Sequence, residues 1–318
     1  MDSCSDNGQE PDAPGQTPGS LSVSGGDNVS SPDLPSPEYP SELQQLANFL
    51  RNQPPSDDQI IEFFLPAEQY RQLAELSPDG RFAGSRLRYD YSSATETLAL
   101  RMPSRKHEYI IQFINDRLLC FLRDPAMVEY TATLRHFGCS DTPYPSKDVT
   151  KLITRQPDIQ ITNMKNPELP VLVCEVGYAQ PIKKLHDLAR EYIEQTGGRI
   201  RTVITLDLAY PRGKRAHLIV WRASFGDDGR FKEVVRGGIV EIRNRHGVKS
   251  PDRAAGLFLS PEDFGFTRGV EISADRHIFT VSLDDLYAAM KSMEENDALV
   301  KAANADWLKS LQAGAEGM

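Results

Sequence analysis

The stretch from residue 155 to residue 180, RQPDIQITNMKNPELPVLVCEVGYAQ, constrains the fold more than any other part of the chain. Apolar and polar residues alternate around Ile159 and Ile161, which is typical of a β-strand. Residues 171–174, VLVC, form a continuous apolar run, which is typical of a strand buried on both faces. The two runs are separated by turn-forming residues, namely Asn163, Asn166, Pro167 and Pro170. The stretch therefore predicts two strands joined by a tight turn.

Antiparallel pairing of these strands places Asp158 opposite Glu175, because the midpoint between them falls inside the turn. A register shifted by one residue is the alternative. Directly opposed residues have Cβ atoms about 5 Å apart on one face of a sheet, and two carboxylates that close repel unless a cation lies between them. Because a hard cation such as Mg²⁺ or Mn²⁺ suits an all-oxygen site, the pair predicts a divalent-metal site. Repulsion in the metal-free state further predicts that Asp158→Ala raises its stability.

Each acid also has an ordinary structural interpretation. Asp158 follows Pro157 and fits a turn, and Glu175 fits an ion pair with an arginine. An ionisable residue directly after VLVC is harder to treat as ordinary, because burying an unpaired charge costs several kcal/mol. Both interpretations stay open on the residues alone.

The acidic charge is concentrated at the two ends of the chain. The 318 residues are 39% hydrophobic and 25% charged, which suits one large domain or two small ones, and the formal net charge is −9. Residues 1–55 carry a net −7 and residues 283–318 a net −4, so residues 56–282 carry +2. This balance neither indicates nor excludes nucleic acid as a partner of the central part.

Composition divides the chain into four segments. Residues 1–40 are rich in Ser, Pro, Gly and Asp, and we expect a disordered acidic tail because they cannot bury enough apolar surface. The remaining segments are N-terminal helices and a hairpin (41–100), an α/β core (101–282) and a C-terminal helix (283–318). No apolar run approaches the roughly 20 residues that span a bilayer, and residues 1–40 show neither the basic start nor the apolar run of a signal segment. We therefore expect an intracellular protein of the nucleus or cytoplasm, not secreted and without a membrane partner.

Local signals predict the order of helices and strands. Helices are expected over 41–52 and 66–76, a hairpin over 86–91 and 95–102, a helix after the N-cap Ser104, a strand within 128–137 and a loop after Gly138. After Glu175, a helix from Pro181 to Gly197 and a strand over 200–208 form a crossover unit, so the strands on either side of that helix should be parallel. Antiparallel strands over 216–222 and 231–243 should follow, and then a strand leading into a helix capped by Ser282.

This order of elements resembles the restriction-endonuclease-like PD-(D/E)xK core. More closely, the segments MPSRKHE, PDIQI, LPVLVCEVGYAQ and VITLDL resemble a group of fungal nuclease-like proteins over about residues 100–222. The resemblance implies an α/β fold with a mixed central sheet flanked by helices. It also implies acidic residues that bind Mg²⁺ or Mn²⁺ and a reaction that cuts phosphodiester bonds of DNA or RNA.

Carried over residue by residue, the resemblance makes Asp158 and Glu175 the metal ligands and Glu108 an additional acid from the first helix. The lysine of the motif falls on Gly177, which can neither hold the attacking water nor stabilise charge on the phosphate. The resemblance then implies that the role of the missing lysine is taken by a residue at the start of the following helix, namely Gln180, Lys183 or Lys184.

The alternatives for these residues are a carboxylate at the positive end of a helix dipole for Glu108 and solvated surface charges for Lys183 and Lys184. Arg155 and the two lysines would contact the nucleic-acid backbone without reading sequence.

Two functions follow. One is a metal-dependent nuclease-like enzyme, impaired by Gly177. The other is a catalytically degenerate nuclease fold that serves as a binding or scaffold module.

Overall fold

The computed structural model describes residues 41–52, 59–76, 88–146, 151–178, 181–210, 213–266 and 277–316. The tail expected over residues 1–40 lies outside the described residues, as does Gln180. The described residues belong to one compact unit. Among the described residues, no helix combines the length and apolar composition needed to cross a bilayer.

Apart from α4, the helices agree closely with the local signals. They are α1 (Ser41–Asn52), α2 (Ala67–Leu76), α3 (Arg105–Arg123), α4 (Val128–Thr131), α5 (Ile182–Gln195) and α6 (Leu283–Glu316). Ser104 caps α3, because its side chain accepts a hydrogen bond from the His107 N–H. The Ser282 hydroxyl accepts from the Asp285 N–H at 3.1 Å, so the predicted cap of α6 is confirmed as well.

The strands form three sheets. In chain order they are β1 (Ile60–Phe64), β2 (Arg88–Ser92), β3 (Thr97–Arg101), β4 (Leu134–His136), β5 (Thr142–Pro145), β6 (Leu152–Arg155), β7 (Ile159–Asn163), β8 (Leu172–Tyr178), β9 (Thr202–Leu208), β10 (Ala216–Phe225), β11 (Phe231–Arg236), β12 (Val240–Arg243), β13 (Gly256–Leu259) and β14 (Phe279–Ser282). The large sheet has the order β11-β10-β9-β8-β7-β4, with β12 beside β10, and the small sheet has the order β1-β3-β2-β6-β5. β13 and β14 pair separately.

The large sheet is mixed, so the expected α/β class is confirmed. β8 and β9 run parallel and α5 connects them, which confirms the predicted crossover unit. β8 pairs with β7, β7 with β4, and β9 with β10 in antiparallel fashion.

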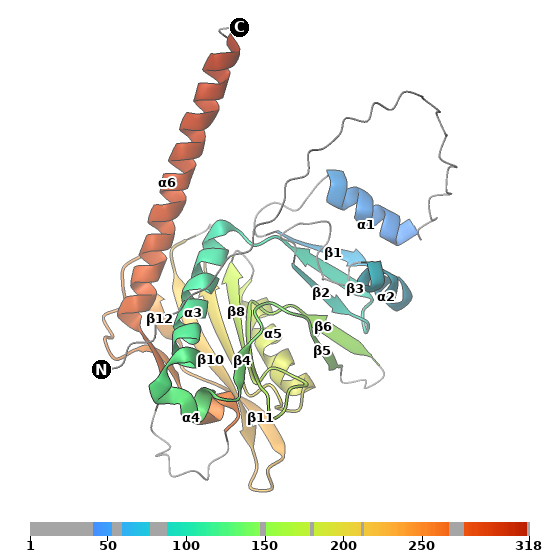
Figure 1. Ribbon diagram of the computed structural model, residues 1–318, viewed down its shortest axis with the longest axis vertical. Coiled ribbons are helices and arrows are strands. Elements are labelled where there is room, and N and C mark those ends of the chain that lie inside the picture. Colours follow the sequence, from blue (N-terminus) through green and yellow to red (C-terminus); the bar gives the residue numbers. More distant parts are fainter. Residues whose placement is uncertain are drawn as a thin grey trace, which may run out of the picture. The chain divides into compact units, whose positions relative to one another are not determined.

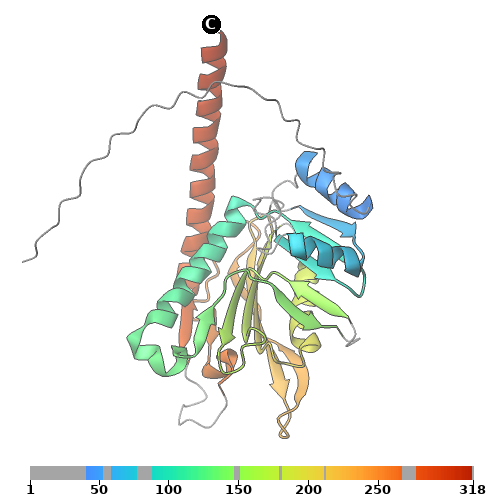
Figure 2. The ribbon, with the colours of Figure 1, turned by 45° about the vertical axis from the view of Figure 1, so that its right-hand side comes forward.

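Helices cover both faces of the large sheet, α3 and α6 on one and α5 on the other (Figures 1 and 2). Alternation along β8 explains this arrangement, because successive side chains of a strand point to opposite faces. Cys174 and Val176 are buried with residues of α3 and α6, whereas Val173 is buried with Ala189 and Tyr192 of α5. A third cluster joins α1 and α2 to the hairpin of the small sheet.

Two segments between α3 and β7 differ from the sequence prediction. Within residues 128–137, where a strand was predicted, the first residues form α4 and only β4 is extended. The Asp124 carboxylate accepts a hydrogen bond from the Ala126 N–H and starts a helical turn after α3, and Tyr130 of α4 packs into the core. The loop predicted after Gly138 contains β5, which pairs with β6 and buries Tyr144. A local helical turn and burial of Tyr130 thus replaced the predicted strand, and a local hairpin replaced the predicted loop.

The predicted strand over 231–243 is interrupted at Gly237. β11 and β12 both pair with β10 in antiparallel fashion, as expected. At the interruption the Gly237 N–H donates to the Val220 carbonyl, and a Cβ at Gly237 would lie 2.7 Å from that oxygen. The close approach of the two backbones therefore requires glycine.

Candidate functional site

The acidic pair lies at the end of the β7–β8 ladder. Ile159 is the partner of Cys174 and Ile161 of Leu172, so Asp158 is directly opposed to Glu175, and the predicted register is confirmed. The side chains of Asp158 and Glu175 are 0% and 2% exposed. Charges buried to this degree need compensation from within the protein.

A pair of arginines from the small sheet supplies the compensation. Arg88 begins β2 and Arg101 ends β3, and the two residues are cross-strand partners. The Arg88 guanidinium donates to Asp158. The Arg101 Nη1 lies 3.7 Å from Asp158 Oδ1 and 3.6 Å from Glu175 Oε2. Arg101 thus lies where the sequence predicted a metal ion.

We call Arg88, Arg101, Asp158 and Glu175 the charge cluster. Like charges directly opposed across two strands destabilise a sheet. Here an opposed arginine pair from one sheet meets an opposed carboxylate pair from the other, so each pair offsets the repulsion within the other. The cluster therefore connects the two sheets through buried, complementary charges.

Asp158 also completes the backbone hydrogen bonding of β8. Its Oδ2 accepts from the Val176 N–H at 2.7 Å, and the His107 Nε2 lies 2.8 Å from the Val176 carbonyl, to which it donates. β7 begins at Ile159, so Val176 lies beyond the stretch that pairs with β7. Two side chains thus satisfy backbone groups that an adjoining strand would otherwise satisfy. This is a structural task for Asp158 and for His107, which is 5% exposed.

Glu108 reaches the cluster through an arginine. It lies in the first turn of α3, and its Oε1 accepts from Arg88 Nη2 at 2.8 Å. Since Arg88 also binds Asp158, a single guanidinium bridges the two carboxylates. The Glu108 side chain is 41% exposed, so part of its charge faces solvent.

A second arginine network lies beside Glu175. The Tyr192 hydroxyl of α5 donates to Glu175 Oε1 at 2.7 Å. Arg155 Nη2 lies 2.8 Å from Glu191 Oε1 and 3.1 Å from Oε2, and the Arg155 side chain is 19% exposed. Arg155 is therefore engaged within the protein, and the prediction that it contacts a nucleic-acid backbone has no support in this geometry.

The surroundings shift the pKa values of the two carboxyls in opposite directions. Burial and the charge of Asp158 raise the pKa of Glu175 while Arg101 opposes them, and the net result is a pKa of about 7. Burial acts in the same direction on Asp158, but the charges of His107, Arg101 and Arg88 hold its pKa well below the usual value. Burial lowers the pKa of His107, yet the Asp158 carboxylate outweighs it and raises that pKa. Asp158 is therefore ionised and stabilised by cations, and the predicted gain of stability from Asp158→Ala is replaced by an expected loss.

The lysines sought in the following helix do not complete the cluster. Gly177 is buried in β8 beside Asp207 of β9. Lys184 lies 3.7 Å from Glu62, and both side chains are more than half exposed. Lys183 lines a separate pocket beside α5. In the described part of the chain, neither lysine forms an ion pair with the cluster; arginines from the small sheet supply its positive charge instead.

A small crevice opens beside the cluster. This crevice of about 30 Å³ is lined by Arg101, His107 and Val176 among others, and neither Asp158 nor Glu175 lines it. This volume is about that of one water molecule in the liquid. The crevice therefore presents cations, not carboxylates, to an approaching group.

The predicted metal ligands do not fit a metal ion in this arrangement. Among the residues that the structure describes, no group of three or more His, Cys, Asp or Glu side chains is arranged to hold one. The oxygens of Asp158 already accept from Arg88 and the Val176 N–H, and Glu175 accepts from Tyr192. A metal ion would have to displace Arg101 from between the carboxylates.

Four residues of the site were missed from the sequence, namely Arg88, Arg101, His107 and Tyr192. Arg88 and Arg101 are opposed in the observed register of β2 and β3, whereas the turn predicted at Ser92 and Ser93 would not have placed them opposite each other. Tyr192 was recognised only as part of an apolar helix face. Comparisons with protein-family models and with curated protein sequences found no match to this chain.

Proposed function

We propose that this chain is a nuclease-like α/β protein without metal-dependent catalysis, which serves as a binding or scaffold module. The observation that carries the proposal is the Arg101 guanidinium, 3.7 Å from Asp158 and 3.6 Å from Glu175. A guanidinium offsets the repulsion between opposed carboxylates, but it lacks the ability of a bound metal to lower the pKa of a water. Gly177, at the position of the motif lysine, is consistent with the same conclusion.

The nuclease-like part of the proposal is supported by connectivity. The elements α3, β4, β7, β8, α5 and β9 follow the order on which the resemblance to the PD-(D/E)xK core rests, with β5 and β6 inserted after β4. Asp158 immediately precedes β7 and Glu175 lies within β8. These are the positions that the resemblance assigns to the acids.

A metal-dependent nuclease acting on DNA or RNA is the second candidate. The observation that favours it is the direct opposition of Asp158 and Glu175, with Glu108 joined to Asp158 through Arg88. This candidate requires Arg101 to leave the space between the carboxylates when Mg²⁺ or Mn²⁺ enters.

One pair of measurements separates the two candidates. The melting temperature is followed by calorimetry with Mn²⁺, Mg²⁺ or EDTA, and cleavage is followed on single- and double-stranded DNA and RNA. A ligand at one hundred times its Kd stabilises the native state by about 2.7 kcal/mol. Metal binding would therefore raise the melting temperature measurably.

We expect no metal-dependent rise and no cleavage that depends on Asp158. A rise in the melting temperature together with cleavage that is lost in Asp158→Asn would establish the second candidate. Asp306→Asn is the matched control, because the Asp306 side chain is 80% exposed on α6.

A further inference from the structure

Helix α6 is longer than the other described helices, and its C-terminal half projects away from them. It has 34 residues, and both views show the projection (Figures 1 and 2). Residues 301–307 are all exposed, and Trp307 is 61% exposed. Because helices in proteins owe most of their stability to packing of an amphipathic face, the projecting half is a candidate interaction surface.

The N-terminal half of α6 packs against α3 through a regularly spaced stripe of side chains. Leu286, Met290 and Met293 are separated by steps of four and three residues, and they are buried in one core with residues of α3. Alternating steps of this kind place side chains along one side of a helix. The same steps continue along α6 through Asp297, Val300, Asn304, Trp307 and Leu311. We call the stripe from residue 286 to residue 311 the seam.

Helix α3 lies along the seam only as far as Asp297. Arg117 of α3 lies 3.2 Å from Asp285 of α6. Lys106 of α3 lies 3.1 Å from Asp297, so the two helices run antiparallel. α3 begins at Arg105, one residue before Lys106. Beyond Asp297 the seam therefore has no helix beside it in the described part of the chain.

The open part of the seam is suited to pairing with itself. Val300 and Trp307 flank one polar residue, Asn304. Neither the Asn304 amide nor the Trp307 indole N–H has a hydrogen-bond partner among the described residues. The charges of residues 298–316 sum to zero, from Lys301, Lys309, Asp306 and Glu316. An uncharged segment attracts neither an acidic nor a basic partner, and it does not repel a second copy of itself.

We propose that the projecting half of α6 pairs in antiparallel fashion with the same segment of a second copy of this chain. The second α6 continues the line of α3 along the seam, in the same direction as α3. With the two-fold axis between residues 305 and 306, residue 300 faces residue 311 of the partner, and Asn304 faces Trp307 of the partner. The indole N–H then has the amide oxygen as an acceptor. A parallel pair does not fit, because each body lies on the seam side of its own helix and the two bodies would collide.

The charges at the helix ends favour this orientation. In the antiparallel pair, the C-terminus of the second α6 points toward the start of α3. A helix carries partial positive charge at its N-terminus and partial negative charge at its C-terminus. Arg105 and Lys106 add positive charge at the start of α3, where Glu108 is already bound by Arg88. Glu316 is the last residue of α6. The two ends that meet are therefore complementary.

The test is the mass of the full-length protein in solution, measured by sedimentation over a range of concentrations. The monomer has a mass of 35.5 kDa, and the pair has twice that mass. The variants are Val300→Glu and Trp307→Ala, and circular dichroism verifies that each is folded. Ala302→Glu is the matched control, because Ala302 is exposed and lies about 200° around the helix from Val300.

We expect a concentration-dependent dimer whose Kd is raised at least about tenfold by Val300→Glu, because burying an unpaired charge costs several kcal/mol. Trp307→Ala should also weaken the dimer, and Ala302→Glu should behave like the wild type. Asn304→Leu should lower the Kd, since a polar residue at a seam position reduces stability. Tryptophan emission should shift to the blue as the dimer forms, and the shift reports Trp307 because Trp221 is only 4% exposed.

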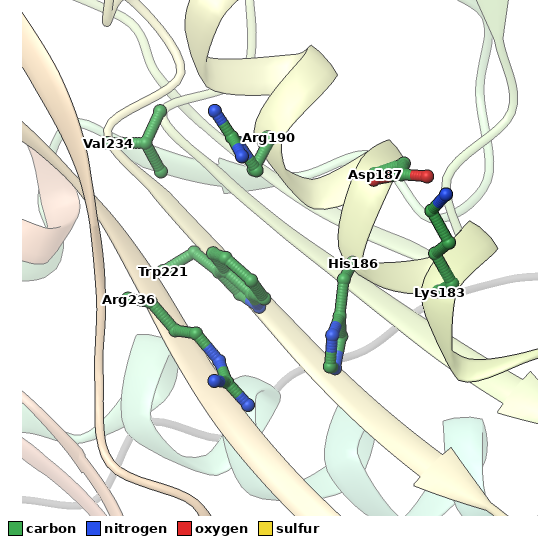
Figure 3. Close-up of a pocket in the computed structure, with 7 residues that line it drawn as sticks. All are labelled: Lys183, His186, Asp187, Arg190, Trp221, Val234 and Arg236. Atoms are coloured by element: carbon green, nitrogen blue, oxygen red, sulfur yellow. The ribbon is translucent and has the colours of Figure 1, made fainter.

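X-ray scattering of the dimer tests the orientation. The antiparallel pair places the two bodies at opposite ends of paired helices about 30 Å long, at about 1.5 Å per residue. The proposal is overturned by a monomer at all concentrations, by a dimer that Val300→Glu leaves intact, or by a dimer whose bodies lie side by side. The pairing involves neither the charge cluster nor the pocket beside α5 that Lys183 lines (Figure 3). Its outcome is therefore independent of the metal and cleavage measurements that test the proposed function.

Discussion

Replacement of Asp158 probes the charge cluster most directly. Its carboxylate receives hydrogen bonds from Arg88 and from the Val176 N–H, and it faces His107 Nε2 at 3.3 Å. Alanine leaves a buried N–H without an acceptor, at a cost of about 1–3 kcal/mol. It also leaves buried cations uncompensated, and breaking one side of a buried ion pair costs about 3–5 kcal/mol. The two costs overlap, so we expect Asp158→Ala to lower the free energy of unfolding by about 4 kcal/mol.

Asp158→Asn separates the two costs. The amide keeps an oxygen for the Val176 N–H and removes the charge, so its loss should be smaller than that of alanine. Because domains are stable by about 5–15 kcal/mol, the asparagine variant also provides a measurement if alanine fails to fold.

The assay is urea denaturation at pH 7 with EDTA, followed by circular dichroism, with unchanged m-values as the condition for comparing midpoints. Asp306→Ala is the control, and its unfolding free energy should change by less than about 0.5 kcal/mol. An Asp158→Ala variant as stable as the wild type, or more stable, would refute the reasoning. It would mean that repulsion from Glu175 outweighs the attraction of the arginines, as in a metal-free metal site.

Three further outcomes are expected. Because the pKa of Glu175 is raised to about 7 from an ordinary value of about 4.3, the stability that its proton provides is complete below that ordinary value and is lost as the pH rises to 7. At about 1.4 kcal/mol per pKa unit this is roughly 4 kcal/mol, so Glu175→Gln should flatten thermal stability between about pH 4 and 7, and a curve parallel to the wild type would contradict this. Arg101→Gln should destabilise the metal-free protein by about 3 kcal/mol. Calorimetry should show that Mn²⁺ restores part of that loss in the variant and leaves the melting temperature of the wild type unchanged. Gly237→Ala should raise the unfolding rate and cost about 1–3 kcal/mol, because its Cβ would meet the Val220 carbonyl at 2.7 Å, whereas Gly238→Ala, with open space around it, is the matched control.

Residues close together in the sequence determined the strand pairing on which the site is built. The turn residues between β7 and β8, together with the two-residue period of strands, sufficed to oppose Asp158 and Glu175. Helix caps at Ser104 and Ser282 and the crossover through α5 were likewise predicted, because each depends on residues close together in the chain.

Only the tertiary structure decided which cation lies between the carboxylates. A metal ion and an arginine satisfy the same electrostatic requirement, and the sequence offers 36 lysines and arginines without stating which is near. Arg101 reaches the pair because the hairpin of the small sheet meets the end of the β7–β8 ladder, and His107 reaches Val176 because α3 packs on the large sheet. β5 and β6 escaped prediction for the same reason, since the hairpin that they form joins the small sheet through β2, about 60 residues earlier in the chain. Coulomb energy depends on distance in space, and distances between residues far apart in the chain are set by packing.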